Sequence, residues 1–227
     1  MERDPASATA EYFAQFRSDI EGFVSREVIE ACTELGVYER PRIRGVAYRA
    51  FIDPSGGSSD SMTLAVGHKG GDGAILDAIR ERRPPFSPDD VTNEFAAVLK
   101  SYGITKVVGD RFGGEWCREP FRRHGINYAL SELPKSGLYQ AFLPVLNSKR
   151  VELLDHNRLF NQLVGLERRT ARGGRDTIDH PPGQHDDIAN VVAGLVVCLG
   201  KNVGYDSTLA WVGERASTLE EFMRRNV

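Results

Sequence analysis

Acidic residues stand at the ends of three apolar runs that lie far apart in the chain. VAYRAFIDPSGG alternates polar and apolar residues like a strand and reaches Asp53 just before a Gly-rich turn, and GITKVVGDRFGGEW reaches Asp110 in the same way. In GQHDDIANVVAGLVVCLG, Asp186 and Asp187 open an apolar helix. A fold that buries these runs together also brings their ends together, so we expect the carboxylates to form one site.

The first two acids both stand at the carboxyl end of an expected strand. Open α/β sheets bind their ligands outside the carboxyl ends of their strands. If the strands ending at Asp53 and Asp110 are parallel neighbours, about 4.8 Å apart, their carboxylates can reach a single ion or a close pair of ions. Taken singly, each acid has a simpler explanation, because Asp is common at helix starts and in turns.

Helical geometry separates Asp186 and Asp187 by about 100° around the axis. We therefore expect Asp187 to be the main ligand and Asp186 to face water or a second ion. Carboxylates without nearby Cys favour Mg²⁺ or Mn²⁺ over zinc. His185, beside the pair, is a candidate for assisting metal binding or proton transfer, and a surface or structural role is the alternative.

The composition is that of a globular protein. Of the 227 residues, 41% are hydrophobic, which is enough for a full core. A net charge of −3 says little about partners, because a carboxylate cluster offsets basic patches elsewhere. The three cysteines are widely spaced and form no CxxC, which argues against a disulfide framework and fits a reducing cytoplasm. No apolar stretch reaches the ~20 residues of a membrane span, so membrane insertion is not expected.

Hydrophobic periodicity predicts an α/β architecture. A helical stretch at 8–35 is followed by a linker-like ERPRIRG, and Gly-rich turns then join three strands into a meander. Helices and strands alternate afterwards. This order implies a mixed sheet, an antiparallel meander followed by parallel strands, flanked by helices. The expected strands are 46–53, 61–68, 74–80, 104–110, 126–130 and 150–154; the expected helices are 91–103, 114–124, 136–147, 156–169 and 187–199, with a hairpin across 168–180.

Residues 46–200 resemble the nuclease domain of the large terminase subunit of tailed bacteriophages, a member of the ribonuclease H-like superfamily. YRAFIDPSGGSSDSMTLAVGH looks like that family's first strand, acid, glycine turn and second strand, and VVGDRFGGEW and GQHDDIANVVAG resemble its second and third acidic motifs. AEYFAQFRSDIEGFVSREVIEAC is similar to the stretch that joins the family's motor domain to its nuclease.

The resemblance also predicts how the chain is divided into domains. No G-x-x-x-x-G-K-[ST] phosphate loop occurs, although large terminases carry an ATPase domain before the nuclease. We therefore expect an isolated domain or a cropped polypeptide. Its parts would be a helical linker from a missing ATPase region at 1–45, the ribonuclease H-like nuclease domain at 46–200 and a C-terminal tail at 201–227.

The activity implied by the resemblance is that of a metal-dependent endonuclease that cuts double-stranded viral DNA concatemers during genome packaging. Asp53, Asp110 and Asp187 would be the catalytic, metal-binding triad, with Asp186 and Asp60 assisting a second Mg²⁺ or Mn²⁺ ion. Asp60 is also explained as a turn residue. The implied partners are double-stranded DNA, the terminase ATPase domain, the small terminase subunit and the portal, in the cytoplasm of an infected bacterium.

Basic residues near the third acidic motif are candidates for DNA binding. A basic hairpin can hold a duplex backbone, and a lysine before a helix can meet phosphate. A solvated charge run and a surface lysine are the alternatives. The candidates are Arg168, Arg169, Arg172 and Arg175, around a Gly-Gly turn, and Lys135.

Two other functions remain open. Another ribonuclease H-like nuclease, such as a junction resolvase or an RNA–DNA hybrid nuclease, would prefer branched or hybrid substrates over plain duplex. A degenerate module that binds DNA or partner proteins without catalysis would keep every activity after Asp53→Ala or Asp187→Ala.

Overall fold

The computed structural model describes residues 20–110, 117–170 and 176–200. Its strands are β1 (Ile20–Gly22), β2 (Thr33–Glu34), β3 (Tyr48–Asp53), β4 (Met62–Gly70), β5 (Gly73–Arg82), β6 (Lys106–Gly109), β7 (Asn127–Leu130), β8 (Val151–Leu154), β9 (Glu167–Thr170) and β10 (Asp176–Asp179). Its helices are α2 (Arg26–Cys32), α3 (Pro88–Ser101), α4 (Arg118–Arg123), α5 (Lys135–Asn147), α6 (Asn157–Gly165) and α7 (Asp187–Gly200).

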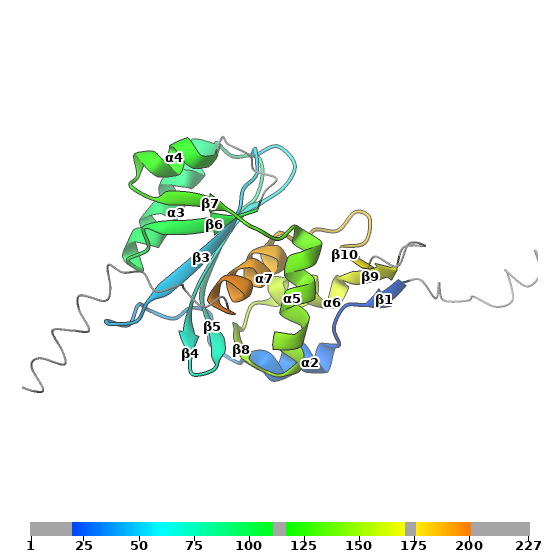
Figure 1. Ribbon diagram of the computed structural model, residues 1–227. Coiled ribbons are helices and arrows are strands. Elements are labelled where there is room, and N and C mark those ends of the chain that lie inside the picture. Colours follow the sequence, from blue (N-terminus) through cyan, green and yellow to red (C-terminus); the bar gives the residue numbers. More distant parts are fainter. Residues whose placement is uncertain (1–19, 111–116, 171–175, 201–227) are drawn as a thin grey trace, which may run out of the picture.

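A seven-stranded mixed sheet forms the centre of the molecule, in the order β2-β8-β5-β4-β3-β6-β7 (Figure 1). β3, β4 and β5 form an antiparallel meander. A tight turn at 71–72 joins β4 to β5, where Gly71 takes a positive φ of 57°, and the longer loop 54–61 joins β3 to β4. The pairs β3–β6, β6–β7, β5–β8 and β2–β8 are parallel. The mixed sheet expected from the sequence is confirmed.

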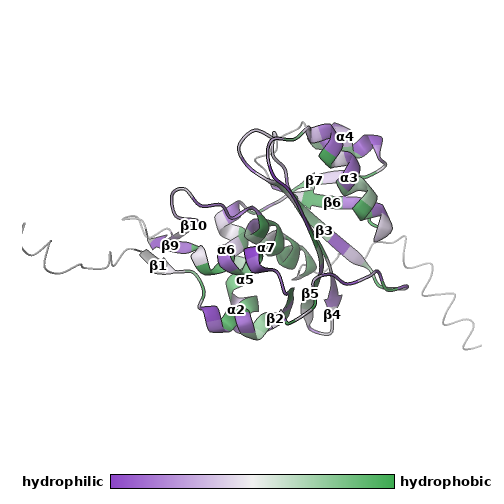
Figure 2. Ribbon diagram, turned by 180° about the vertical axis from the view of Figure 1, so that it is seen from behind, coloured by the Kyte–Doolittle hydropathy of each residue, from purple (hydrophilic) through white to green (hydrophobic). Residues whose placement is uncertain are grey.

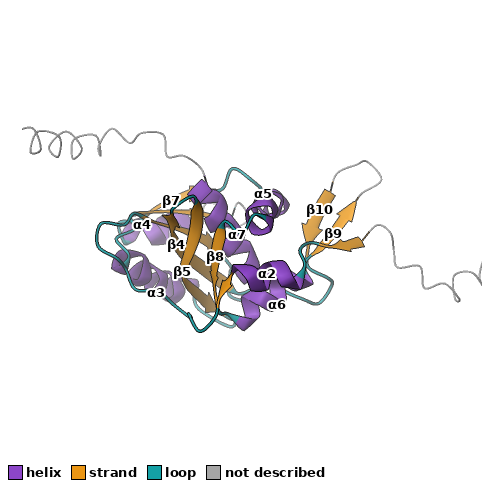
Figure 3. Cartoon of the chain, turned by 90° about the horizontal axis from the view of Figure 1, so that it is seen from below, coloured by secondary structure: helices purple, strands orange, loops and turns teal. Residues whose placement is uncertain are grey.

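Helices cover both faces of this sheet. Strand side chains alternate between faces, so Phe51 and Ala65 pack under α7, whereas Ile52 and Leu64 pack on the other face, which α3 and α4 cover. α2, α5 and α6 lie outside α7 (Figure 3). Each face therefore has its own hydrophobic core.

α7 is the central helix of the larger core. Its residues are hydrophobic along almost the whole length (Figure 2), because the sheet covers one side and α5 and α6 cover the other. Gly194 lets the helix approach the sheet closely: a Cβ there would lie 2.5 Å from the Phe51 ring. This close packing fixes the first turn of α7 relative to the end of β3.

A separate three-stranded sheet, in the order β1-β9-β10, extends from the helical side of the molecule (Figure 3). β9 and β10 form the expected hairpin, whose Gly-Gly turn lies outside the described residues. β1 pairs with β9 in antiparallel fashion, with Glu21 opposite Arg168.

Two sequence expectations were wrong in this region. The helix expected at 8–35 is, in its described part, a strand, a short helix and a second strand. The helix expected at 156–169 ends at Gly165, and its last residues belong to β9. In both places, pairing between distant segments overrides the local periodicity.

The described part of 1–45 packs onto the main domain, since Phe23, Val24, Ile29 and Cys32 join the core around α7. Its origin as a linker from an ATPase region stays a prediction. Residues 1–19, 111–116 and the tail at 201–227 lie outside the described residues. No helix in the described ranges has the length and hydrophobicity that crossing a membrane requires.

Candidate metal centre

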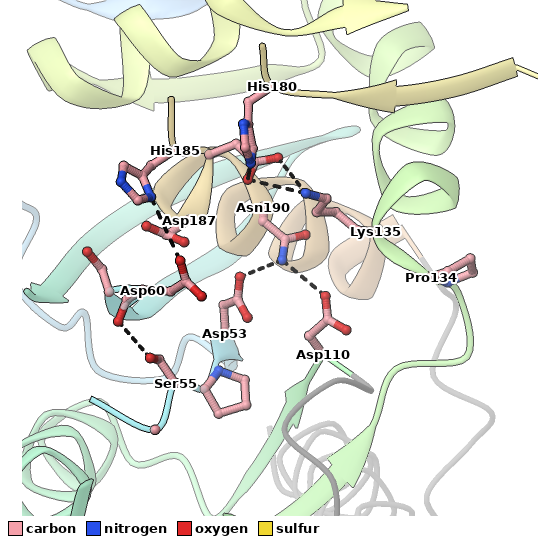
Figure 4. Close-up of a pocket in the computed structure, with 14 residues that line it drawn as sticks. Asp53, Ser55, Asp60, Asp110, Pro134, Lys135, His180, His185, Asp187 and Asn190 are labelled. Carbon is pink, nitrogen blue, oxygen red and sulfur yellow. Dashed lines mark hydrogen bonds and ion pairs between the residues drawn. The ribbon is translucent and has the colours of Figure 1, made fainter. Parts of the chain in front are cut away.

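The acids identified in the sequence line one cavity of about 630 Å³ (Figure 4). It lies where β3 and β6 end and α7 begins, with α5 on one side. The ionisable and amide side chains lining it belong to Asp53, Asp60, Asp110, Lys135, His180, His185, Asp186, Asp187 and Asn190. The fold thus brings together every acid proposed as a ligand.

Asp53 and Asp110 come from adjacent parallel strands. Ile52 pairs with Gly109, and the Asp110 amide donates a hydrogen bond to the Ile52 carbonyl at 3.0 Å. The adjacency assumed from the sequence is confirmed. Gly109 leaves room for the Tyr128 side chain, because a Cβ at Gly109 would lie 1.9 Å from the Tyr128 hydroxyl oxygen. That hydroxyl donates to the Asp110 carbonyl at 3.4 Å and so supports the end of β6.

Asn190 links these two carboxylates. Its Nδ2 donates to Asp53 Oδ2 at 2.7 Å and to Asp110 Oδ2 at 3.1 Å. The side chain is 1% exposed. This residue was not among those predicted from the sequence. The available signal was its position three residues after Asp187, which places both on one face of the helix.

Asp187 has a buried carboxylate with an unused oxygen. The residue is 8% exposed, and its Oδ2 has no hydrogen-bond partner in the described part of the chain. Its backbone is held firmly: Thr63 donates its hydroxyl to the Asp187 carbonyl at 3.0 Å, and Gln162 Oε1 accepts from two backbone amides of the first turn of α7. Burial, and then the neighbouring Asp186, raises the pKa of Asp187. An unpaired buried oxygen of this kind favours a bound proton or cation.

Asp60 and His185 complete a second group of donors around Asp187. Single ligand atoms of these three residues all lie within 4.8 Å of one another, and His185 Nδ1 lies 3.9 Å from Asp60 Oδ1. Two carboxylates and an imidazole suit a divalent ion. Because transition metals accept imidazole ligands more readily than Mg²⁺ does, the presence of His185 favours Mn²⁺ at this group of donors. Asp60 and His185 are exposed, so only Asp187 is rigidly placed.

Asp186 faces α5 instead. Its Oδ2 accepts a hydrogen bond from the Tyr139 hydroxyl at 2.9 Å and lies 3.1 Å from Lys135 Nζ, which also contacts Asp179 Oδ1 at 2.7 Å. Burial opposes protonation of Lys135, but Asp179 and Asp186 outweigh it and raise the Lys135 pKa. The lysine therefore supplies positive charge beside Asp186. The expected roles of Asp186 as a ligand of a second ion and of Lys135 in DNA binding stay predictions.

No protein-family model matches the sequence, and no curated protein matches it. Solved structures do match. The large terminase nuclease from thermophilic phage G20c aligns with a TM-score of 0.65 at 17% identity, over 77% of this chain and 97% of that chain. The nuclease domain of the large terminase subunit of bacterial virus Sf6 aligns with a TM-score of 0.61 at 14% identity, over 81% of this chain and 100% of that chain. This chain has the large-terminase nuclease fold. The HK97 bacteriophage large terminase also aligns, with a TM-score of 0.62 at 16% identity, over 79% of this chain and 44% of that chain.

Within this terminase-nuclease fold, Asp53 has the largest pKa shift among the described Asp and Glu side chains. Burial raises the pKa of Asp53 to about 8; the Asn190 hydrogen bond opposes this shift, and the charges of Asp110, Asp187 and Asp186 add to it. Clustered, desolvated carboxylates are costly unless positive charge joins them. The donor set therefore fits a divalent cation: hard oxygen ligands, mutual repulsion and an unpaired oxygen on Asp187.

The end of the β9–β10 hairpin reaches this cavity, because His180, which follows β10, lines it. Arg168 is paired with Asp176 through both Nε, at 2.9 Å, and Nη2, and Arg169 Nη2 lies 2.8 Å from Glu167. Both arginines are partly exposed and within reach of solvent. Arg172 and Arg175 lie outside the described residues. A DNA-binding role for the four arginines stays a prediction.

Proposed function

We propose that this chain is a divalent-metal-dependent endonuclease that cuts double-stranded DNA, the nuclease part of a phage large terminase. One observation carries the proposal: Asp53 at the end of β3, Asp110 directly after β6 and Asp187 at the start of α7 converge on one cavity in a terminase-nuclease fold. A fold alone does not fix a function, but acids that converge on one cavity, with an unpaired buried oxygen on Asp187, point to a catalytic centre.

The chain's own groups have distinct tasks in this proposal. Asp53 and Asp110, fixed on rigid strand ends, hold one face of the site, and Asp187, fixed by the backbone contacts of α7, holds the other. Two bound divalent ions would supply activation of the attacking water and neutralisation of the leaving oxygen. Burial raises the pKa of Asp53, so a divalent ion would compete with a proton for this carboxyl.

Structures with the same fold support the choice of ion. The G20c nuclease has been solved with bound magnesium and with bound cobalt, and a variant of the Sf6 nuclease domain with manganese. In this chain, Asp53 and Asp110 form one group of oxygen donors, and Asp60, His185 and Asp187 form another. Two groups of donors in one cavity are consistent with a pair of Mg²⁺ or Mn²⁺ ions.

The substrate and partners follow from the same proposal. Duplex DNA would lie across the cavity mouth, with the basic hairpin and Lys135 near its phosphates. The terminase ATPase domain, the small terminase subunit and the portal would be its partners, and viral DNA concatemers its substrate during genome packaging, in the cytoplasm of an infected bacterium.

The decisive experiment is a nicking assay. The purified chain is incubated with supercoiled plasmid and Mg²⁺ or Mn²⁺, and nicked and linear products are measured on a gel. We expect cutting that EDTA abolishes and that falls by at least about a hundredfold in Asp53→Ala, while DNA binding measured by anisotropy is retained. Asp72→Ala, which removes an exposed acid from the β4–β5 turn, is the matched control and should cut like the wild type.

Competing substrates separate the alternatives. Preference for a four-way junction or an RNA–DNA hybrid over plain duplex would assign the chain to another ribonuclease H-like activity. Absence of cutting with either ion, together with DNA binding that survives Asp53→Ala and Asp187→Ala, would favour a non-catalytic binding module.

A further inference from the structure

Asn190 occupies the position between Asp53 and Asp110 (Figure 4). Its amide nitrogen contacts one oxygen of each carboxylate, at 2.7 and 3.1 Å, and the side chain is 1% exposed. Asn190 belongs to the rigid first turns of α7, and its backbone amide donates to the Asp186 carbonyl at 2.8 Å. The amide is thus delivered to the acids by the same helix that delivers Asp187.

Only the nitrogen end of the Asn190 amide makes hydrogen bonds with the described residues. The NH₂ end of the amide, which can only donate hydrogen bonds, is the end that faces Asp53 and Asp110. Its Oδ1 is buried and has no partner among the described residues. The side chain therefore leaves one buried acceptor without a hydrogen bond while its donor contacts two carboxylates. An unsatisfied buried acceptor lowers the stability of the protein, so the two donated hydrogen bonds must offset that loss.

We propose that Asn190 is a positioning residue that competes with the divalent cation for Asp53 and Asp110. The inference rests on the proposed metal-dependent function. The amide hydrogens and an ion both take the lone pairs that Asp53 Oδ2 and Asp110 Oδ2 present to the cavity. While the amide holds them, the carboxylates stay aligned and their repulsion is reduced. When an ion binds between them, it must first displace these hydrogen bonds.

This competition has a thermodynamic consequence. The Asn190 hydrogen bonds stabilise the ion-free protein and are lost when the ion binds. The free energy of these bonds is therefore subtracted from the free energy of ion binding. Removing the amide should therefore tighten metal binding, the opposite of what removal of a ligand does. Two hydrogen bonds are together strong enough for a change of about tenfold in the dissociation constant.

The test is calorimetric titration of Mn²⁺ into the full chain and its Asn190→Ala variant, with thermal melts in EDTA and in saturating Mn²⁺. We expect Asn190→Ala to bind Mn²⁺ about tenfold more tightly, to melt lower than the wild type in EDTA and to recover most of that deficit with Mn²⁺. A cavity left by the truncation is present with and without the ion, so it cancels from the comparison. Asn190→Ser, too short to bridge both carboxylates, is the second variant if Asn190→Ala does not fold.

Thr92→Ala is the matched control. Thr92 is 1% exposed and donates its hydroxyl to the Pro88 carbonyl in the other core, away from the cavity, so its loss should lower stability and leave Mn²⁺ affinity unchanged. Equal Mn²⁺ affinity in the wild type and Asn190→Ala would overturn the inference, and weaker affinity would make Asn190 a ligand instead. Failure of the wild type to bind any ion would count against the proposed function itself.

Discussion

Replacing Asp53 by Asn should change how the stability of the protein depends on pH. The pKa of Asp53 is raised to about 8 by burial and by its acidic neighbours, from a value of 3.8 in the absence of those effects. Between these two values the folded protein binds a proton that the unfolded chain has released. Stability is therefore greatest at the acidic end of this window and is lost as the pH rises through it.

The size of the effect follows from that one proton. A difference of one bound proton changes the free energy of unfolding by about 1.4 kcal/mol per pH unit. For a chain of this size, 1 kcal/mol corresponds to a Tm change of roughly 2–4 °C, so the wild-type Tm should fall by about 3–6 °C per pH unit between pH 5 and pH 8. Asn at position 53 cannot ionise, so the Tm of Asp53→Asn should fall by about 3–6 °C less per pH unit than the wild-type Tm. Asp53→Asn should therefore be the more stable protein at pH 8.

Thermal melts followed by circular dichroism, in EDTA and across pH 5–9, measure this slope. Asp72→Asn removes a carboxylate from an exposed turn and controls for the change in net charge. Equal slopes in the wild type and Asp53→Asn, or a wild-type Tm that rises with pH across the window, would refute the reasoning. Because ion binding displaces the proton, the affinity for Mn²⁺ should also increase over the same pH range.

Three further predictions concern packing, charge and DNA. Gly194→Ala should destabilise the protein by about 1–3 kcal/mol in urea unfolding, because the added Cβ meets the Phe51 ring at 2.5 Å and this outweighs the better helix propensity of Ala. Lys135→Met should lower the free energy of unfolding by about 1–3 kcal/mol by leaving Asp186 without its cation, whereas Lys135→Arg should lose less. Arg168→Ala should reduce the slope of log K against log salt for duplex binding by about 0.9 if the residue contacts one phosphate, and an unchanged slope in anisotropy titrations would exclude that contact.

The positions of the acids could be predicted because each is fixed by a local pattern. The alternation leading to Asp53, the apolar run leading to Asp110 and the helical stripe after Asp187 identify a strand end, a second strand end and a helix start. The parallel pairing of β3 and β6 was an assumption from the order of the elements, and the structure confirms it.

The parts that could not be predicted depend on distant partners. β1 is a strand because it pairs with β9, with Ile20 opposite Arg169, and nothing within the local sequence indicates that partner. The pairing of Lys135 with Asp179 and Asp186 likewise joins segments more than forty residues apart. Asn190 was missed for a different reason: a single polar residue in an apolar helix has no periodicity of its own.

The placement of α7 has a consequence for protein synthesis. The helix is the last element of the described fold, yet it fills the larger core and carries both Asp187 and Asn190, which meets Asp53 across 137 positions of sequence. A nascent chain emerges from the ribosome in sequence order, so β3 to β6 are exposed long before their covering helix exists. The cluster of acids is therefore completed only after the whole sheet has been synthesised, and any shorter translation product lacks the site.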